Sequence, residues 1–279
     1  MRYSSRFFLY APFSLFVILA VGVGVQWWRE ASAWTKQIDA LNGHEISPGV
    51  TLHFSSRQIA GFPFRVDTIF KDFRITFAGP RTFKWRTEDF ALHRLSYGSG
   101  KTVFEAGGKQ SFSWIGSDGK PAGFAFLPGS VRADAITANG RLTRFDLVIV
   151  AFDSPKVTAG RIEFHLRHDP KIDALDLVTF ADNLSLPQQR PLLHAQMDSR
   201  ITMAQFLNGM LSGDADWRTV LEAWRGGEGR IELTDVQSKE KFAAIDTKGR
   251  MMLNGQHQLT GTLATEMFGL SELATAPLY

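Results

Sequence analysis

Few residue groups in this chain have the spacing that chemistry requires. The stretch "YGSGKT", Tyr97 to Thr102, resembles the end of a phosphate-binding loop, in which glycine-rich backbone cradles phosphate ahead of a helix. The full pattern is G-x-x-x-x-G-K-[ST], and Leu95 occupies the position of its first glycine. The residues that follow alternate like a strand. The stretch therefore predicts a hairpin turn rather than a nucleotide site.

Histidines and carboxylates could bind a metal or act as acid and base. The stretch "HLRHD" begins at His165, but residues three apart on a strand point to opposite faces, so its two imidazoles diverge. The pairs Glu88 with Asp89 and Asp173 with Asp176 could exchange protons, although acidic pairs on solvated faces are more common. The chain has no cysteine, which excludes thiol catalysis and zinc–thiolate sites. We expect no enzyme activity, no metal and no cofactor.

The N-terminal segment has the composition of a membrane span. No charged residue lies between Arg6 and Arg29, and this run is long enough to cross a hydrocarbon core of about 30 Å. Trp27 and Trp28 follow the apolar run, where aromatic side chains favour the membrane interface. Cationic residues favour the cytoplasmic side, so Arg2 and Arg6 orient the chain. We expect a single-pass inner-membrane protein with a cytoplasmic N-terminus and a periplasmic main domain.

A cleaved signal peptide is the alternative interpretation of this segment. Ala31 to Ala33 have the small-residue spacing of a cleavage site. The apolar run exceeds the roughly 7–15 residues of a signal h-region, and "WWRE" separates it from that site, so an uncleaved anchor is favoured. The expected segments are a cytoplasmic tail at 1–6, a transmembrane anchor at 7–28, a juxtamembrane helix at 29–43 and a periplasmic β-rich domain at 44–279.

Beyond the anchor, the periodicity predicts an antiparallel sheet. Helical spacing of apolar residues continues to about Leu41, after which Asn42 and Gly43 end the helix. The period then changes to two, as in Phe73 to Phe77 and in Ile162 to Arg167. The fold class is mainly β: a transmembrane helix, then a curved antiparallel sheet forming an open groove or half-barrel. The sequence leaves closure into a barrel open.

A short helical hairpin at about 202–226 is expected to interrupt the strands. Asp214 or Asp216 can cap its second helix. This helix contains Trp224, and the pair Gly226-Gly227 stops it.

The composition gives this fold much apolar area to cover. The chain of 279 residues contains 23 Phe but only 4 Tyr, and phenylalanine has no polar handle. The net charge is +3, and no dense cluster of lysine and arginine occurs. We therefore expect no nucleic-acid partner.

The stretch "GFPFR", Gly61 to Arg65, punctuates the start of the sheet. Gly61 can take backbone angles that other residues avoid, and Pro63 cannot donate to a sheet ladder. These residues indicate an edge kink or bulge, with Phe62 and Phe64 on opposite faces and one of them a candidate for the core. The alternative is ligand contact by Phe62, Phe64 and Arg65, in which the guanidinium pairs with a lipid phosphate.

The same stretch, close behind an N-terminal anchor, resembles the signature of the alphaproteobacterial domain-of-unknown-function family numbered 2125. The segments "KWRTEDFALHRL", "LEAWRGGEGRIEL" and "DTKGRMMLNGQHQLTGTL" are also similar to that family. The family is related in style to AsmA-like envelope proteins, which carry one anchor and a long curled sheet forming an apolar groove. The resemblance implies a protein that holds or moves lipid and supplies no catalytic residues. This chain is too short to bridge two membranes.

Three functions remain open. The first is a non-enzymatic, membrane-anchored periplasmic protein that binds or transfers phospholipid or fatty acid in a β groove. The second is an envelope scaffold whose sheet edge or helical hairpin docks a protein partner. The third, a hydrolase, has the least support because no convergent polar residues stand out.

Overall fold

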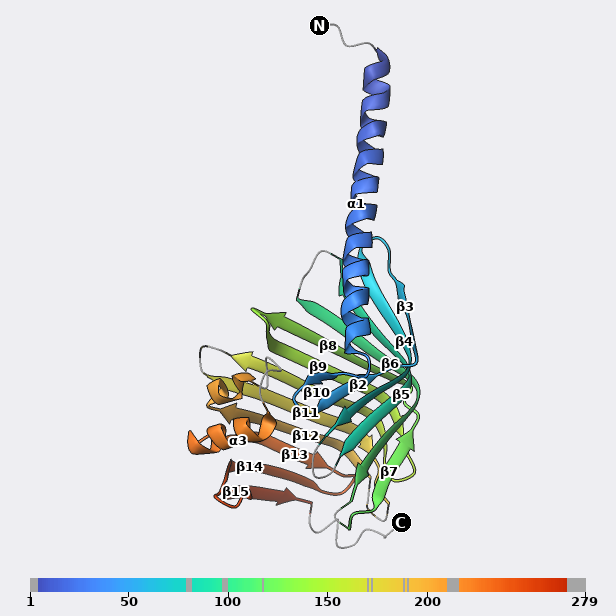
Figure 1. The fold of residues 1–279 in the computed structure, drawn as a ribbon. Coiled ribbons are helices and arrows are strands. Elements are labelled where there is room, and N and C mark those ends of the chain that lie inside the picture. Colours follow the sequence, from blue (N-terminus) through green and yellow to red (C-terminus); the bar gives the residue numbers. More distant parts are fainter. Residues whose placement is uncertain are drawn as a thin grey trace.

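The computed structural model describes residues 5–78, 82–96, 100–116, 118–169, 171, 173–187, 189, 191–209 and 216–269. Most of these residues form one antiparallel sheet, and helix α1 (Ser5–Leu41) projects from one end of it (Figure 1). A 3-10 turn, η1 (Ala204–Leu207), and helix α3 (Trp217–Gly226) come late in the chain. The strands are β1 (Glu45–Ser47), β2 (Val50–His53), β3 (Ser56–Ala60), β4 (Arg65–Phe77), β5 (Phe83–Leu95), β6 (Lys101–Ile115), β7 (Pro121–Phe126), β8 (Ser130–Ala138), β9 (Arg141–Asp153), β10 (Thr158–Asp169), β11 (Ala174–Leu184), β12 (Leu192–Thr202), β13 (Ile231–Lys239), β14 (Ala244–Leu253) and β15 (Leu259–Phe268).

The strand order follows the sequence almost without exception. The order is β1-β2-β4-β5-β6-β8-β9-β10-β11-β12-β13-β14-β15. The long strands β4 and β6 each hold two successive neighbours on one edge, which places β3 beside β4 and β7 beside β6. The two ends of this order are β1 and β15, so the sheet is open rather than a closed barrel. The mainly β, antiparallel fold class is confirmed.

Helix α1 belongs to two environments. Its N-terminal part stands clear of the sheet, and apolar side chains such as Phe13, Phe16 and Ile18 are exposed (Figure 1). Its last turns pack on the sheet, where Ile38 is buried and Trp34 and Leu41 lie against the same cluster. The helix ends at Leu41, as the sequence predicts.

The cluster beside α1 is built from stacked aromatic rings. Its buried members are Ile38, Phe54, Phe70, Phe73, Phe90 and Ala106. The rings of Phe73 and Phe90 are stacked at 4.1 Å between centroids. A left-handed residue, Asp72 at φ 51°, interrupts the alternation of β4. It allows both Phe70 and Phe73 to join this cluster on one face of the sheet.

A second cluster forms under η1 and α3. Its buried members are Leu175, Ala204, Leu207, Val220 and Trp224. The indole Nε1 of Trp224 donates to the Thr202 carbonyl at 2.7 Å, so its polar atom is satisfied. Asp216 caps α3 by accepting from the Thr219 N–H. The other expected cap, Asp214, lies outside the described residues.

Candidate functional site: an apolar strip, a polar ladder and a turn beside the anchor

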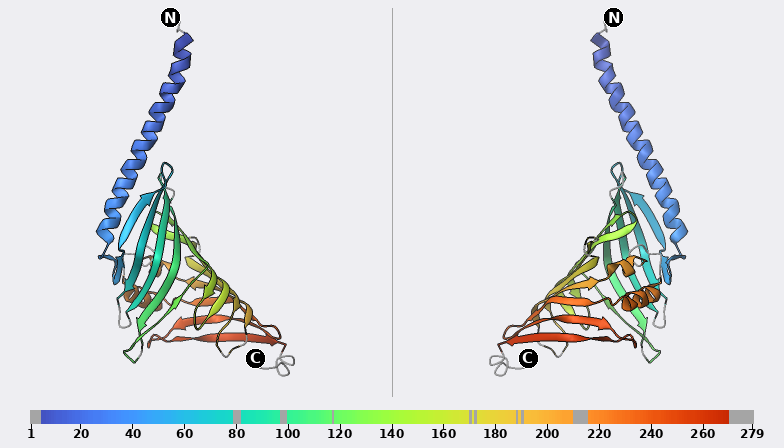
Figure 2. Two further views of the ribbon diagram at one scale, coloured as in Figure 1. Left: turned by 90° about the vertical axis from the view of Figure 1, so that its right-hand side faces the viewer. Right: turned by 90° about the vertical axis from the view of Figure 1, so that its left-hand side faces the viewer.

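Cross-strand register assigns each strand residue to one of two faces. Both helices pack on the same face, as the side views show (Figure 2). Between them, six half-buried apolar side chains of β9, β10 and β11 point to that face, and we call them the apolar strip. The members of the apolar strip are Phe145, Leu147, Ile149, Ile162, Phe164 and Leu177.

The apolar strip packs mainly on itself. Leu147 lies opposite Phe164, Ile149 lies opposite Ile162, and the rings of Phe145 and Phe164 are 6.0 Å apart. None of the six belongs to the cluster beside α1 or to the cluster under α3. The strip is therefore a stretch of apolar sheet that neither helix covers completely. Such a surface can bind an apolar ligand or partner.

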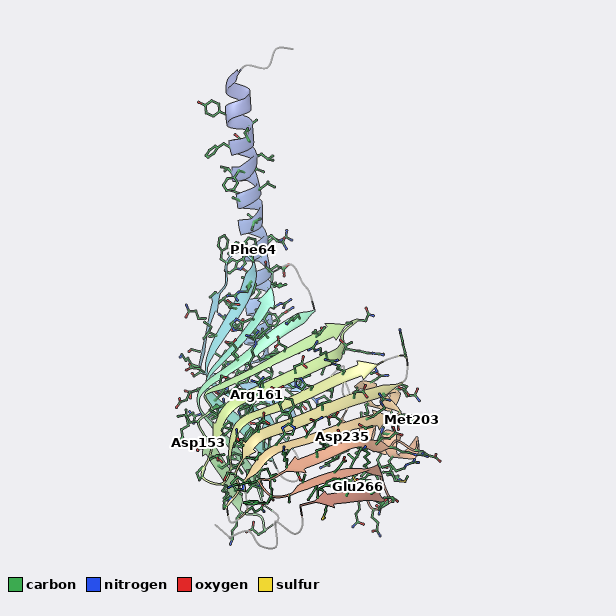
Figure 3. The ribbon with its side chains drawn as sticks, turned by 180° about the vertical axis from the view of Figure 1, so that it is seen from behind. Phe64, Asp153, Arg161, Met203, Asp235 and Glu266 are labelled. Atoms are coloured by element: carbon green, nitrogen blue, oxygen red, sulfur yellow. The ribbon has the colours of Figure 1, made fainter. Side chains whose placement is uncertain are left out.

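The opposite face carries alternating charged and imidazole side chains on β9 to β12, which we call the polar ladder. Its members are Arg144, Asp146, Arg161, Glu163, His165, Asp182 and His194. Figure 3 views this face, with Arg161 and Asp235 labelled. In its middle, Nδ1 of His165 lies 2.8 Å from Asp146 and Nε2 lies 2.8 Å from Glu163. Arg161 pairs with Glu163 from the same strand. The carboxylates of Asp146 and Glu163 are thus buried under the cations that neutralise them.

The ladder shifts the pKa values of its members. Burial alone would raise the pKa of Asp146, but hydrogen bonds from His165 and Arg144 outweigh burial and hold it below its ordinary value. Burial would also lower the pKa of His165, but bonding to Asp146 and Glu163 raises it instead. The pKa of His194 is raised chiefly by its hydrogen bond to Asp182. These imidazoles therefore hold protons more tightly than free histidine.

Two hollows on the polar face are lined by charges that already have partners. The first, of about 440 Å³, lies among Arg65, Glu105 and Arg132, and Arg132 pairs with Glu105 at 3.3 Å. The second, of about 490 Å³, includes Asp176 and Arg200, which pair at 2.7 Å. The chemistry of both hollows is that of ion-pair networks.

The carboxylate pairs singled out in the sequence take structural partners. Asp89 pairs with Lys71, and Glu88 accepts from the Lys109 N–H at 2.9 Å. Asp173 accepts from the Gln205 N–H at 2.6 Å, which holds the start of η1. Each carboxylate is therefore engaged within the fold.

The phosphate-loop interpretation is not supported where the structure describes it. Tyr97 to Ser99 lie outside the described residues. From Lys101 onward the chain forms strand β6, whereas a phosphate loop must lead into a helix.

The "GFPFR" residues form the turn from β3 into β4. Gly61 has φ 93°, and a Cβ added there would lie 2.8 Å from the Arg65 carbonyl oxygen, so only glycine fits. Phe62 and Phe64 are 62% and 63% exposed, so the expectation that one of them reaches the core is wrong. Both lie in the turn before β4 begins, where the alternation of a strand does not apply. The peptide between Phe62 and Pro63 is cis.

This turn contacts helix α1 directly. The indole Nε1 of Trp27 donates to the Arg65 carbonyl at 2.6 Å, and the ring of Trp27 meets that of Phe62 edge-on at 5.4 Å. Phe64 lies at the same end of the sheet, beside α1 (Figure 3). The Arg65 guanidinium pairs with Asp67 at 3.2 Å. Sequence reasoning missed Trp27 as a partner of the turn, although its place at the end of the apolar run was a signal.

The remaining sequence-predicted residues lie at the far helix. Trp224 is 2% exposed and anchors α3 on the sheet. The helix ends at Gly226, and the N–H of Gly227 closes it by donating to the Ala223 carbonyl at 2.9 Å. A Cβ on Gly227 would lie 2.3 Å from the Phe206 ring, so close approach of the ring requires glycine here.

Comparison with known proteins places the chain in a family. Helix α1 is long and apolar enough to cross a membrane, which makes it a candidate single-pass anchor. No match was found among curated proteins or among solved structures. Residues 27–277 match the family described as an uncharacterized protein conserved in bacteria (DUF2125). Because this match runs from Trp27 through the turn and the whole sheet, the chain belongs to that family of bacterial proteins.

Proposed function

We propose that the protein is a membrane-anchored, non-enzymatic lipid-binding protein whose apolar strip holds an acyl chain of a phospholipid or fatty acid. The observation that carries the proposal is the strip itself. Phe145, Leu147 and Phe164 present apolar area on the side of the sheet that the anchor enters. Burying apolar surface contributes about 25 cal/mol per Å², so an acyl chain laid along the strip gains affinity from area alone.

The proposed anchor, α1, brings the sheet close to membrane lipid. A helix that spans a bilayer keeps the sheet beside a store of acyl chains at high local concentration. The side chains of the strip lie on the face on which α1 packs. An acyl chain that leaves the membrane beside α1 therefore has the shortest path to this face. The proposed setting is the inner membrane, with the N-terminus in the cytoplasm and the sheet in the periplasm.

The resemblance of this family, noted above as alphaproteobacterial, to AsmA-like envelope proteins supports the same proposal. Those proteins combine one anchor with a curled sheet that forms an apolar groove. Analogy of fold is a weaker reason than the side chains of this sheet, so the test is aimed at the side chains.

The test compares two phenylalanines on neighbouring strands. The full chain is purified in mild detergent, and bound lipid is counted by native mass spectrometry. We expect stoichiometric phospholipid or fatty acid on the wild-type protein. Phe164→Gln, in the apolar strip, should raise the Kd for lipid by about tenfold and so lower the bound fraction, since it removes about 1.4 kcal/mol or more of apolar contact.

Phe180→Gln is the matched control. Phe180 lies on the next strand but on the polar face, between His165 and His194. This variant should keep its lipid, and both variants should keep the circular dichroism of the wild type. An empty wild-type protein, or equal loss of lipid from both variants, would contradict the proposal.

A second candidate function, docking of a protein partner, is favoured by strand β15. Among the described residues it pairs with β14 on one side only, and it ends the sheet order. Its whole length is exposed, including Leu259 and Leu263. An unpaired strand edge offers a template to an added strand. A lipid-free wild-type protein would make this the leading function.

A further inference from the structure

The turn from β3 to β4 exposes the two most exposed large apolar side chains outside α1 in the described part of the chain. These are Phe62 and Phe64. Single exposed apolar residues are common on protein surfaces. Two that lie close together at the tip of a turn form a protruding apolar patch. Its place in the molecule suggests what covers it.

Contact with α1 fixes the depth of this patch. The ring of Phe62 lies 5.4 Å from the Trp27 ring, and its Cε2 atom is 4.0 Å from the position of a Cβ on Gly24. Because a helix rises about 1.5 Å per residue, Gly24 lies about 4.5 Å further into the apolar run than Trp27. The tip of the turn is therefore level with the last turn of the membrane span, where aromatic residues favour the interface.

The backbone of the turn is prepared for a poorly hydrated place. Four of the five carbonyl oxygens from Gly61 to Arg65 accept hydrogen bonds within the protein. The Gly61 carbonyl accepts from the Arg65 N–H, that of Pro63 from the Ser96 hydroxyl and that of Phe64 from the Ser96 N–H. The Arg65 carbonyl accepts from the Trp27 indole. Burying a carbonyl group without a partner is costly, and these four avoid that cost.

We propose that this turn inserts Phe62 and Phe64 into the interfacial layer of the bilayer that α1 spans, so that the sheet holds the membrane at a second point. The exposed guanidinium of Arg65, next in the chain, then lies at the height of lipid phosphates. Two attachment points, the helix and the turn, fix the tilt of the sheet, which one flexible point cannot do. This inference rests on α1 crossing a bilayer and not on lipid binding by the apolar strip.

The absence of cysteine makes a direct test simple, since one introduced cysteine is the only label site. The full chain is placed in nanodiscs of phosphatidylethanolamine and phosphatidylglycerol, with a nitroxide on Phe62→Cys or on Phe64→Cys. The matched control is Leu127→Cys, an equally exposed apolar residue after β7 at the other end of the sheet. Collisions with oxygen, which partitions into lipid, are compared with collisions with a water-soluble nickel complex.

Positions 62 and 64 should show oxygen access above nickel access, and position 127 should show the reverse. As a second readout without the label, a water-soluble maleimide should react about tenfold more slowly at positions 62 and 64 than at 127, because the thiolate forms poorly in lipid. Equal nickel access and equal maleimide rates at all three positions would overturn the inference. Lipid counted on the strip by mass spectrometry is unaffected by either result, so the two proposals fail separately.

Discussion

Phe164 on β10 and Phe180 on β11 lie on neighbouring strands, yet they face opposite sides of one sheet. Phe164 packs against Phe145 in the apolar strip. Phe180 lies between the imidazoles of His165 and His194 in the polar ladder. The same residue type thus serves two surfaces that are stabilised by different physics.

The apolar face is stabilised by area removed from water, and the polar face by pairing of charges. Burial is cooperative within each cluster, whereas each exposed ion pair contributes only about 0–1 kcal/mol. Only where carboxylates such as Asp146 and Glu163 are buried does the polar face carry a large penalty for a lost partner. Substitutions on the two faces should therefore differ in size and in their dependence on pH.

The largest effect is expected in the aromatic cluster beside α1. Phe73→Ala should lower the free energy of unfolding by about 3–5 kcal/mol, because Phe73 is 2% exposed and stacks on Phe90. Phe77→Ala, on the same strand but 42% exposed, should cost much less and is the control. Urea unfolding followed by tryptophan fluorescence measures both. Equal losses for the pair would mean that the cluster is not the core of this end.

An intermediate effect is expected on the polar face. Asp146→Asn should lower the free energy of unfolding by about 1–3 kcal/mol, since it weakens the hydrogen bonds of His165 and Arg144 to a buried carboxylate. Lys71→Ala breaks the exposed pair with Asp89 and should change stability by no more than about 0.5 kcal/mol. Urea unfolding followed by tryptophan fluorescence measures both variants. If Lys71→Ala lowered the free energy of unfolding as much as Asp146→Asn, the distinction between buried and exposed ion pairs would not hold.

The smallest effect is a dependence on pH. The pKa values of His165 and His194 are raised above 6.5, so their stabilising contribution is complete below that pH and is lost as pH rises through the folded-state pKa values. The pKa of Asp146 is lowered below 3.8, so its contribution holds above that value and is lost in acid. Melting temperature should therefore decline slightly from about pH 6 to about pH 8.

His165→Gln is the variant that sharpens the pH comparison. It removes the central imidazole of the ladder, so its melting temperature should fall less steeply over the same interval than that of the wild type. A steeper fall in the variant would assign the dependence to other groups.

The strands were largely predictable from sequence, because two-residue alternation survives in most of them. In β10, Ile162, Phe164 and Leu166 alternate with charged residues. The apolar side chains lie on one face of the sheet and the charged ones on the other, as expected. The positions where alternation changes phase were not predictable. At Asp72 a left-handed backbone reverses the alternation of β4, although the register with β5 is the same on both sides of it, and nothing in the sequence of β4 marks this position.

The candidate site was predictable only in part. The "GFPFR" stretch stood out by composition, yet the place of Phe62 against Trp27 depends on how α1 docks on the sheet. The apolar strip was hidden because the run Leu147 to Val150 is apolar on both faces. Which section of the sheet stays uncovered depends on where the two helices land, and this is a tertiary property.

The nearly sequential strand order also has a kinetic consequence. Each strand pairs mostly with its neighbour in sequence, and the aromatic cluster beside the anchor uses residues 34–131, whereas the second cluster uses residues 166–253. Pairings between near neighbours close short loops, so they cost little chain entropy and form quickly. A chain synthesised from its N-terminus can thus complete the first cluster while the residues of the second are still being made. Helix α1, which is made first and contributes Trp34 and Ile38 to the first cluster, is then the surface on which the sheet begins to form, one strand at a time.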